Sequence, residues 1–222
     1  MIAEVNGIKL FYEKRGEGRP IVMVHGNGED HTIFDKAAVS LSARYAVYCV
    51  DSRCHGQSED TPELHYADMA ADMVAFLEAL DLHDVVFYGF SDGGIIGLMA
   101  AAQTDRITTL IVSGANTSPE AVKPWLKVLI TVLRVFTRDK KITLMLNEPH
   151  ITDEELGKIR ARTLVLAGSG DVVPEWETRH IAAAIPGAKM KILPGEDHGS
   201  YIVHSLKIAE LIREFLRGEE KS

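Results

Sequence analysis

The sequence lacks the features that mark several classes of protein. Its 222 residues include two cysteines, Cys49 and Cys54, which are too few for a disulfide scaffold. Acidic residues outnumber basic ones by 32 to 24, and this balance argues against a nucleic-acid partner because phosphate binding needs clustered Lys and Arg. The longest apolar stretch, residues 128–136, is interrupted by Arg134 and is too short to span a bilayer.

Two further absences bear on location and cofactors. The first residues alternate in polarity and carry charges where a secretory segment would be apolar, so we expect a cytoplasmic protein without a membrane partner. Cys54 and His55 are adjacent, but no second pair of ligands with suitable spacing accompanies them, so we expect no metal site. The sequence predicts no other cofactor.

What is present describes an ordinary globular domain. Hydrophobic residues make up 46% of the chain and charged residues 25%, which excludes global disorder. The length suits one large α/β domain, which buries enough surface to fold without disulfides or metals.

Apolar runs and helical patterns alternate along the chain. Residues 2–5 and 8–14 form a predicted hairpin around Asn6-Gly7. Continuous apolar runs, which fit strands covered on both faces, follow at 21–24, 46–50, 85–90, 110–112 and 163–167, with a weaker edge strand at 189–193. Helical patterns fall at 67–80, 93–103, 175–185 and 201–217. This order predicts an α/β fold with a doubly wound, mostly parallel sheet and a ligand site at the strand C-terminal ends.

One segment, residues 117–150, breaks the alternation. It has no strand signal, and its apolar residues recur at helical spacing, so we expect two or three inserted helices. We interpret the segment as a small helical cap over the site, with Trp125 and Leu129 in contact with substrate. Because the segment is short, the chamber should be small and should favour short acyl groups. The alternative is one crossover helix followed by a long loop.

The strongest signal for chemistry surrounds Ser91. The sequence Gly89-Phe90-Ser91-Asp92-Gly93 is a G-x-S-x-G motif between a predicted strand and a predicted helix of small residues. At such a sharp turn the serine backbone is strained and its hydroxyl projects above the sheet. Glycines are needed on either side because the neighbouring backbone leaves no space for a Cβ. The alternative is a glycine-rich turn with a surface serine.

A serine hydroxyl needs a base, and nine histidines are available. His198 is favoured because it lies just past the last predicted strand, at the same sheet edge as Ser91. His204 falls within the predicted last helix, and His25 suits a structural role beside Gly26. The other histidines, at 31, 55, 65, 83, 150 and 180, have no such context.

The base needs an acid that holds its tautomer, and Asp171 is the candidate. It follows a predicted strand in the stretch GSGDVVP, again at a strand C-terminal end. Ser91, Asp171 and His198 then occur in the chain order Ser, Asp, His. The alternative role for Asp171 is a cap for the helix that begins near Pro174. Asp197 is a poor rival because it is adjacent to His198.

An oxyanion hole needs two N–H donors near the developing negative charge. The backbone of Asp92 supplies one at the start of its helix. The other should come from the loop His25-Gly26-Asn27-Gly28, where the N–H of Asn27 is preferred over that of Gly28. Gly26 and Gly28 should let the chain approach the substrate closely.

Taken in order, these stretches resemble the α/β-hydrolase fold family, specifically small bacterial serine hydrolases with a short cap. The matching stretches are HGNG at 25–28, DSRCHGQS at 51–58, GFSDGG at 89–94, GSGDVVP at 168–174 and GEDHG at 195–199. The resemblance implies that Ser91 attacks an acyl carbon while His198 and Asp171 move the proton. One departure is Cys54, which replaces the first glycine of the family's D-x-R-G-x-G-x-S stretch and puts the local backbone conformation in question.

We therefore expect a cofactor-free serine hydrolase that cleaves a small carboxylic ester through an acyl-enzyme on Ser91. Carbon–carbon bond hydrolases and cofactor-free haloperoxidases or perhydrolases have similar triads and are alternatives. Haloalkane dehalogenases are disfavoured because they use an aspartate where this chain has Ser91. A small-molecule sensor with little turnover is an alternative of a different class, because fold alone does not determine function.

Overall fold

The computed structural model describes residues 1–218. Within that range eight strands form one sheet in the order β1-β2-β4-β3-β5-β6-β7-β8. The strands are β1 (Ile2–Val5), β2 (Ile8–Arg15), β3 (Arg19–Val24), β4 (Tyr45–Val50), β5 (Val85–Phe90), β6 (Ile107–Ser113), β7 (Arg162–Gly168) and β8 (Lys189–Leu193). The pairings from β3–β4 to β7–β8 are parallel, which confirms the predicted doubly wound, mostly parallel sheet.

The predicted hairpin opens the sheet. β1 and β2 pair antiparallel, with Val5 opposite Ile8. Asn6 and Gly7 have φ angles of 48° and 78°, the pair of left-handed conformations that a tight hairpin turn requires.

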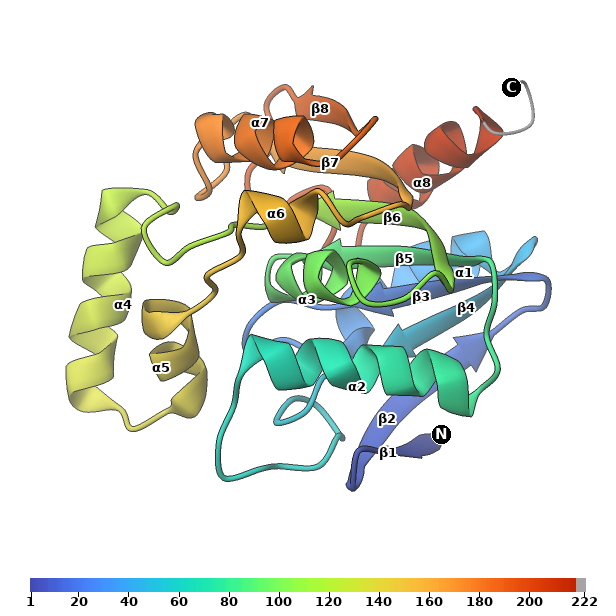
Figure 1. Cartoon of the computed structure of the whole chain (residues 1–222), viewed down its shortest axis with the longest axis horizontal. Helices are drawn as coiled ribbons and strands as arrows, with labels where there is room; N and C mark the ends of the chain where they lie inside the picture. Colours follow the sequence, from blue (N-terminus) through green and yellow to red (C-terminus); the bar gives the residue numbers. More distant parts are fainter. Residues whose placement is uncertain (219–222) are drawn as a thin grey trace.

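Helices cover both faces of the sheet (Figure 1). One face carries the 3₁₀ turn η1 (His31–Phe34), α1 (Asp35–Leu41) and α8 (Lys207–Arg217). The other carries α2 (Tyr66–Ala79), α3 (Asp92–Ala101), α6 (Asp153–Leu156) and α7 (Glu175–Ala184). Successive residues of a strand point to opposite faces, so Ile21 packs with one set of helices and Val22 with the other. Because helices cover both faces of the sheet, the side chains on both sides of a strand are apolar, which explains the continuous apolar runs.

Two helix predictions differ from the structure. The sequence pattern does not indicate η1 and α1, and it predicts a last helix from 201 that instead begins at Lys207. Residues 201–206 form turns, where His204 has a φ of 49°. The N–H of His204 donates to the Ile33 carbonyl at 2.8 Å, and its Nδ1 lies 3.0 Å from Asp35 Oδ1. Contact with a distant segment therefore outweighs local helical periodicity here.

Two helices, α4 (Pro124–Phe136) and α5 (Lys140–Asn147), stand outside these layers (Figure 1). They are inserted between β6 and β7, in the segment predicted to break the alternation. The Ile151 N–H donates to the Thr117 carbonyl at 2.9 Å and closes the neck of the insertion. Thr117 in turn donates from its N–H and its hydroxyl to Glu177, a buried residue of α7.

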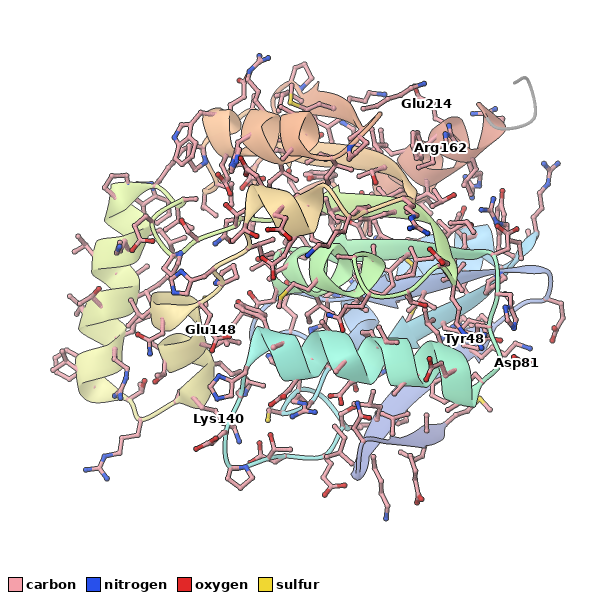
Figure 2. The ribbon with its side chains drawn as sticks, viewed as in Figure 1. Tyr48, Asp81, Lys140, Glu148, Arg162 and Glu214 are labelled. Atoms are coloured by element: carbon pink, nitrogen blue, oxygen red, sulfur yellow. The ribbon has the colours of Figure 1, made fainter. Side chains whose placement is uncertain are left out.

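Side-chain contacts tie both ends of α5 to the body of the protein (Figure 2). At its start, Lys140 donates to the Asp60 carboxylate. After its end, Glu148 lies 2.6 Å from His65 Nδ1 and accepts the Tyr66 N–H at 3.0 Å. Both contacts hold α5 against the loop that precedes α2.

None of the helices in residues 1–218 is long and apolar enough to cross a membrane. Both cysteines are buried free thiols, and burial raises the pKa of Cys49 to about 12.

Cys54, at the position where the resembled family has a glycine, has a left-handed backbone. Its φ is 64°, in the left-handed region that favours glycine. Its N–H donates to the Glu59 carbonyl at 2.9 Å, and its Sγ lies 3.2 Å from Thr61 Oγ1. These contacts maintain the turn in spite of the side chain.

Candidate active site

Ser91 connects β5 to α3 through a strained backbone. Its φ of 53° and ψ of −115° are unfavourable for a residue with a side chain. A Cβ on Gly89 would lie 2.0 Å from the Gly93 carbonyl oxygen, and one on Gly93 would lie 2.0 Å from that of Val24. The Ser91 N–H donates to the Ser113 carbonyl on β6 at 2.8 Å. Both glycines are therefore required for this turn.

The structure brings Ser91, Asp171 and His198 into one hydrogen-bonded chain. Ser91 Oγ lies 3.1 Å from His198 Nε2, and His198 Nδ1 lies 2.6 Å from Asp171 Oδ1. A proton on Nδ1 donates to the buried Asp171 carboxylate, which leaves Nε2 to accept the serine proton. The Phe90 ring packs on the imidazole, with ring centroids 4.9 Å apart.

Asp197, the rival candidate for the acid, has other partners. Asp197 Oδ1 accepts the N–H groups of Gly199 and Ser200 at 2.9 and 2.8 Å, so this carboxylate shapes the loop that carries His198.

His25 joins the ends of β3 and β4. Its Nε2 accepts the Ser52 N–H at 3.1 Å, so its Nδ1 donates to the Gly26 carbonyl at 2.8 Å. Burial lowers the pKa of His25 to about 4, which keeps the ring neutral. His25 therefore has a structural role, as the sequence analysis expected.

Gly114 is a site residue that the sequence analysis did not identify. It directly follows β6 with a φ of 61°, and a Cβ there would lie 2.6 Å from His198 Cε1 and 3.3 Å from Asp171 Oδ2. Gly114 leaves space for the Asp171 and His198 side chains. The only sequence signal for this role is a glycine that follows a predicted strand.

The loop after β3 passes close to the nucleophile. A Cβ on Gly26 would lie 3.1 Å from Ser91 Cβ. Among the hydrogen bonds of the described residues, neither the Asn27 N–H nor the Asp92 N–H has a protein acceptor. The Asn27 side chain donates to Asp92 Oδ2 at 2.8 Å, which links the two predicted oxyanion donors.

Glu29 holds this loop from inside the site. Its Oε2 accepts the Gly26 N–H at 2.9 Å. Burial raises the pKa of Glu29, against the opposing effects of the Gly26 hydrogen bond and nearby His198. Burial also raises the pKa of Asp92. Sequence motifs did not indicate Glu29, because its role depends on how the loop folds back.

A cavity of about 340 Å³ opens above Ser91 and His198. The inserted helices supply one apolar wall, made of Leu126, Leu129, Ile130, Leu133, Ile142 and Met145. The described lining residues also include three carboxyl groups, Glu29, Asp92 and Glu148, and no Lys or Arg.

Two predicted substrate contacts lie elsewhere, whereas Gly26 and Leu129 line the cavity. Trp125 is 57% exposed and does not line the cavity, because it lies one turn before Leu129 at the exposed edge of the row of lining residues on α4. Gly28 is also outside the cavity lining. No atom lies within 4 Å of the position of a Cβ on Gly28, whose φ of 74° places it in an open turn.

One cluster has the composition of a metal site. Ligand atoms of Asp30, His31 and Asp51 lie within 4.8 Å of one another. Asp51 Oδ1 already accepts the His31 N–H and lies 2.8 Å from His31 Nδ1, and Oδ2 accepts the Gln57 N–H. These hydrogen bonds hold the loop after β4, which explains why the three side chains lie together.

Comparison with known proteins places this arrangement in a family. Residues 19–146 match the family model described as the alpha/beta hydrolase fold. The chain belongs to the alpha/beta hydrolase fold family.

Individual relatives are distant. The chain is 28% identical over 155 residues to a pimeloyl-[acyl-carrier protein] methyl ester esterase of Aliivibrio salmonicida (strain LFI1238), a match that covers 69% of this chain and 58% of that protein. It is 26% identical over 246 residues to the serine hydrolase BPHL of Mus musculus, covering 96% and 84% of the two chains. The crystal structure of the enol-lactonase from Burkholderia xenovorans LB400 has the same fold, with a TM-score of 0.81, 23% identity and coverage of 98% and 100%. The chain is thus an alpha/beta hydrolase similar to esterases.

The partly buried Glu29 carboxyl should make this alpha/beta hydrolase less stable at high pH. Because burial raises its pKa, native-state stability falls as pH rises through that pKa. Glutamine keeps an oxygen acceptor for the Gly26 N–H and does not ionise. We expect Glu29→Gln to raise the urea midpoint of unfolding at about pH 8, with the gain shrinking toward about pH 4. The exposed Glu4→Gln is the control, and a gain independent of pH would contradict the explanation.

Proposed function

We propose that this alpha/beta hydrolase is a carboxylesterase that cleaves small esters through an acyl-enzyme on Ser91. The observation that carries the proposal is the chain of hydrogen bonds from Ser91 through His198 to Asp171 at the floor of a cavity. The strained turn holds the serine hydroxyl toward that cavity, and a serine with a positioned base and acid is the arrangement that acyl transfer requires.

The proposed reaction has two halves. Ser91 Oγ attacks the ester carbonyl carbon while His198 Nε2 takes its proton, and the N–H groups of Asn27 and Asp92 bind the oxyanion. The intermediate collapses, the alcohol leaves with the proton from His198, and the acyl group stays on Ser91. Water then attacks the acyl-enzyme as His198 takes its proton, the bond between the acyl carbon and Ser91 Oγ breaks as His198 returns that proton to Oγ, and the carboxylic acid departs. Asp171 stabilises the imidazolium form in both halves.

The cavity favours a small, uncharged ester. Its volume of about 340 Å³ is near the lower end for ligand sites, and its outer wall is apolar. Glu29, Asp92 and Glu148 face the same space without a neighbouring Lys or Arg among the described lining residues, so a substrate carboxylate would meet only negative or neutral groups. Similarity to a methyl ester esterase supports ester cleavage over carbon–carbon bond cleavage.

We further propose that residues 117–150 act as a cap that limits substrate size. Leu126, Leu129, Ile130 and Leu133 of α4 line the cavity opposite the nucleophile, and the neck and the ends of α5 are hydrogen-bonded to the body. The wall is therefore a fixed surface against which an acyl group would pack.

The nucleophile is tested with a fluorophosphonate probe. We expect the parent protein to be labelled at Ser91 and Ser91→Ala to remain unlabelled, because no other serine within residues 1–218 has a hydrogen-bonded base and acid in this arrangement. Ser113→Ala, at a buried serine on the neighbouring strand, is the matched control and should keep its label. Labelling of Ser91→Ala would refute the assignment.

The orienting acid is tested by Asp171→Asn. An amide at this position favours the wrong histidine tautomer, so kcat for p-nitrophenyl acetate should fall by a factor on the order of 10⁴ with folding unchanged. Asp197→Asn should have a much smaller effect, because Asp197 bonds to loop N–H groups. A larger loss in Asp197→Asn would reverse the two roles.

The cap is tested by acyl-chain preference. Leu129→Ala and Leu133→Ala remove side chains from the cavity wall, so the preference of kcat/KM among p-nitrophenyl esters should move toward longer acyl groups. Val132→Ala changes the same helix outside the cavity lining and should leave the preference unchanged. An unchanged preference in both cavity variants would show that α4 does not determine substrate size.

A further inference from the structure

The outer face of α4 carries exposed apolar side chains that the cavity does not use. These outer-row residues are 49% to 80% exposed and comprise Trp125, Val128, Val132, Val135 and Phe136. Their spacing places them along one side of the helix, next to the row that lines the cavity. Contiguous exposed apolar surface of this kind marks an interaction site.

The segment around α4 is basic, although the protein as a whole is acidic. The chain has a net charge of −8, yet residues 121–147 contain one acidic residue, Asp139, and six basic ones: Lys123, Lys127, Arg134, Arg138, Lys140 and Lys141. Lys127 and Lys140 pair with carboxylates. In the part of the chain that the structure describes, Lys123 and Arg138, which flank α4, have no carboxylate partner.

We propose that α4 docks this protein on an anionic lipid surface. The outer-row residues enter the interface, while Lys123 and Arg138 contact anionic headgroups at the two ends of the helix. An amphipathic helix with Trp and Phe on its apolar side and Lys and Arg beside it binds membranes in this way, lying in the plane of the interface. This proposal departs from the sequence-based expectation of no membrane partner, which rested on the charged first residues and the shortness of the longest apolar stretch.

The position of α4 suits such a contact. It lies at the outer edge of the molecule, so that it can reach a surface ahead of the acidic body (Figure 1). Leu129 and Leu133 line the cavity and are also 47% and 40% exposed, so apolar surface continues from the outer row to the cavity wall. The docked face is therefore next to the wall of the proposed catalytic site.

A second copy of the chain fits this face less well. Two α4 helices packed antiparallel through their outer rows would bring Lys123 of one copy toward Arg138 of the other. The outer face of 13 residues is roughly 20 Å long and offers only a few hundred Å² per partner, against about 800 Å² in a stable interface. The repulsion between like charges and the small contact area both favour a lipid surface over a second copy of the chain.

The test is co-sedimentation of the full chain with vesicles, which does not require catalysis. We expect binding to vesicles of phosphatidylglycerol and phosphatidylcholine, weaker binding at high salt, and little binding to phosphatidylcholine alone. With Trp176→Phe, Trp125 becomes the only tryptophan, and its fluorescence should shift to shorter wavelength on the anionic vesicles. Val132→Glu with Val135→Glu should abolish binding, and Lys123→Glu with Arg138→Glu should weaken it by about tenfold or more.

The matched controls lie on α1, on the other side of the molecule (Figure 1). Val39→Glu and Lys36→Glu alter an exposed valine and an exposed lysine and should leave vesicle binding unchanged. All variants should hydrolyse a water-soluble ester like the parent, which separates this proposal from the proposed function. Absence of binding to anionic vesicles would overturn the proposal, as would a dimer in light scattering that dissociates in Val132→Glu with Val135→Glu. Equal loss of binding in the α1 controls would also overturn it.

Discussion

The turn between β5 and α3 is the constraint on which the candidate site depends. Ser91 occupies a backbone conformation that side-chain-bearing residues avoid. The surrounding backbone leaves no space for a side chain at Gly89 or Gly93, so this turn requires both glycines. This one turn aims the hydroxyl into the cavity and places the Asp92 N–H at the start of a helix. Asp171 and His198 come from the loops after β7 and β8, parallel strands of the same sheet whose C-terminal ends lie at the same edge as that of β5.

Buried and partly buried carboxylates support the candidate site in different ways. Asp171 accepts from His198, Glu29 accepts the Gly26 N–H in the loop after β3, and Glu177 accepts from Thr117 at the neck of the insertion. Each is stabilised by specific donors, because a buried charge without partners would be costly. Burial raises the pKa of Glu29, so the cavity has an acid beside its nucleophile whose charge depends on pH.

Helix α4 of the insertion has apolar side chains both on the cavity wall and on the outer surface of the molecule. Leu126 and Ile130 of α4 form cavity wall, while Val128 and Val135 are exposed on another side. A helix that is apolar on two sides needs two environments, and the body supplies only one. The outer row is therefore the feature of the cap that catalysis alone does not explain.

The sequence by itself determined the order of the strands and of the longer helices, the G-x-S-x-G turn and the candidates Ser91, Asp171 and His198. These features are local, because alternation, apolar runs and crowded glycines act within a few residues of the chain. The tertiary structure alone decided the roles of Gly114 and Glu29, the exposure of Trp125 and the turn at His204. Each depends on a neighbour distant in sequence: Gly114 makes room for His198, and His204 bonds to Ile33. Local patterns do not encode such contacts, because they arise only when the layers pack together.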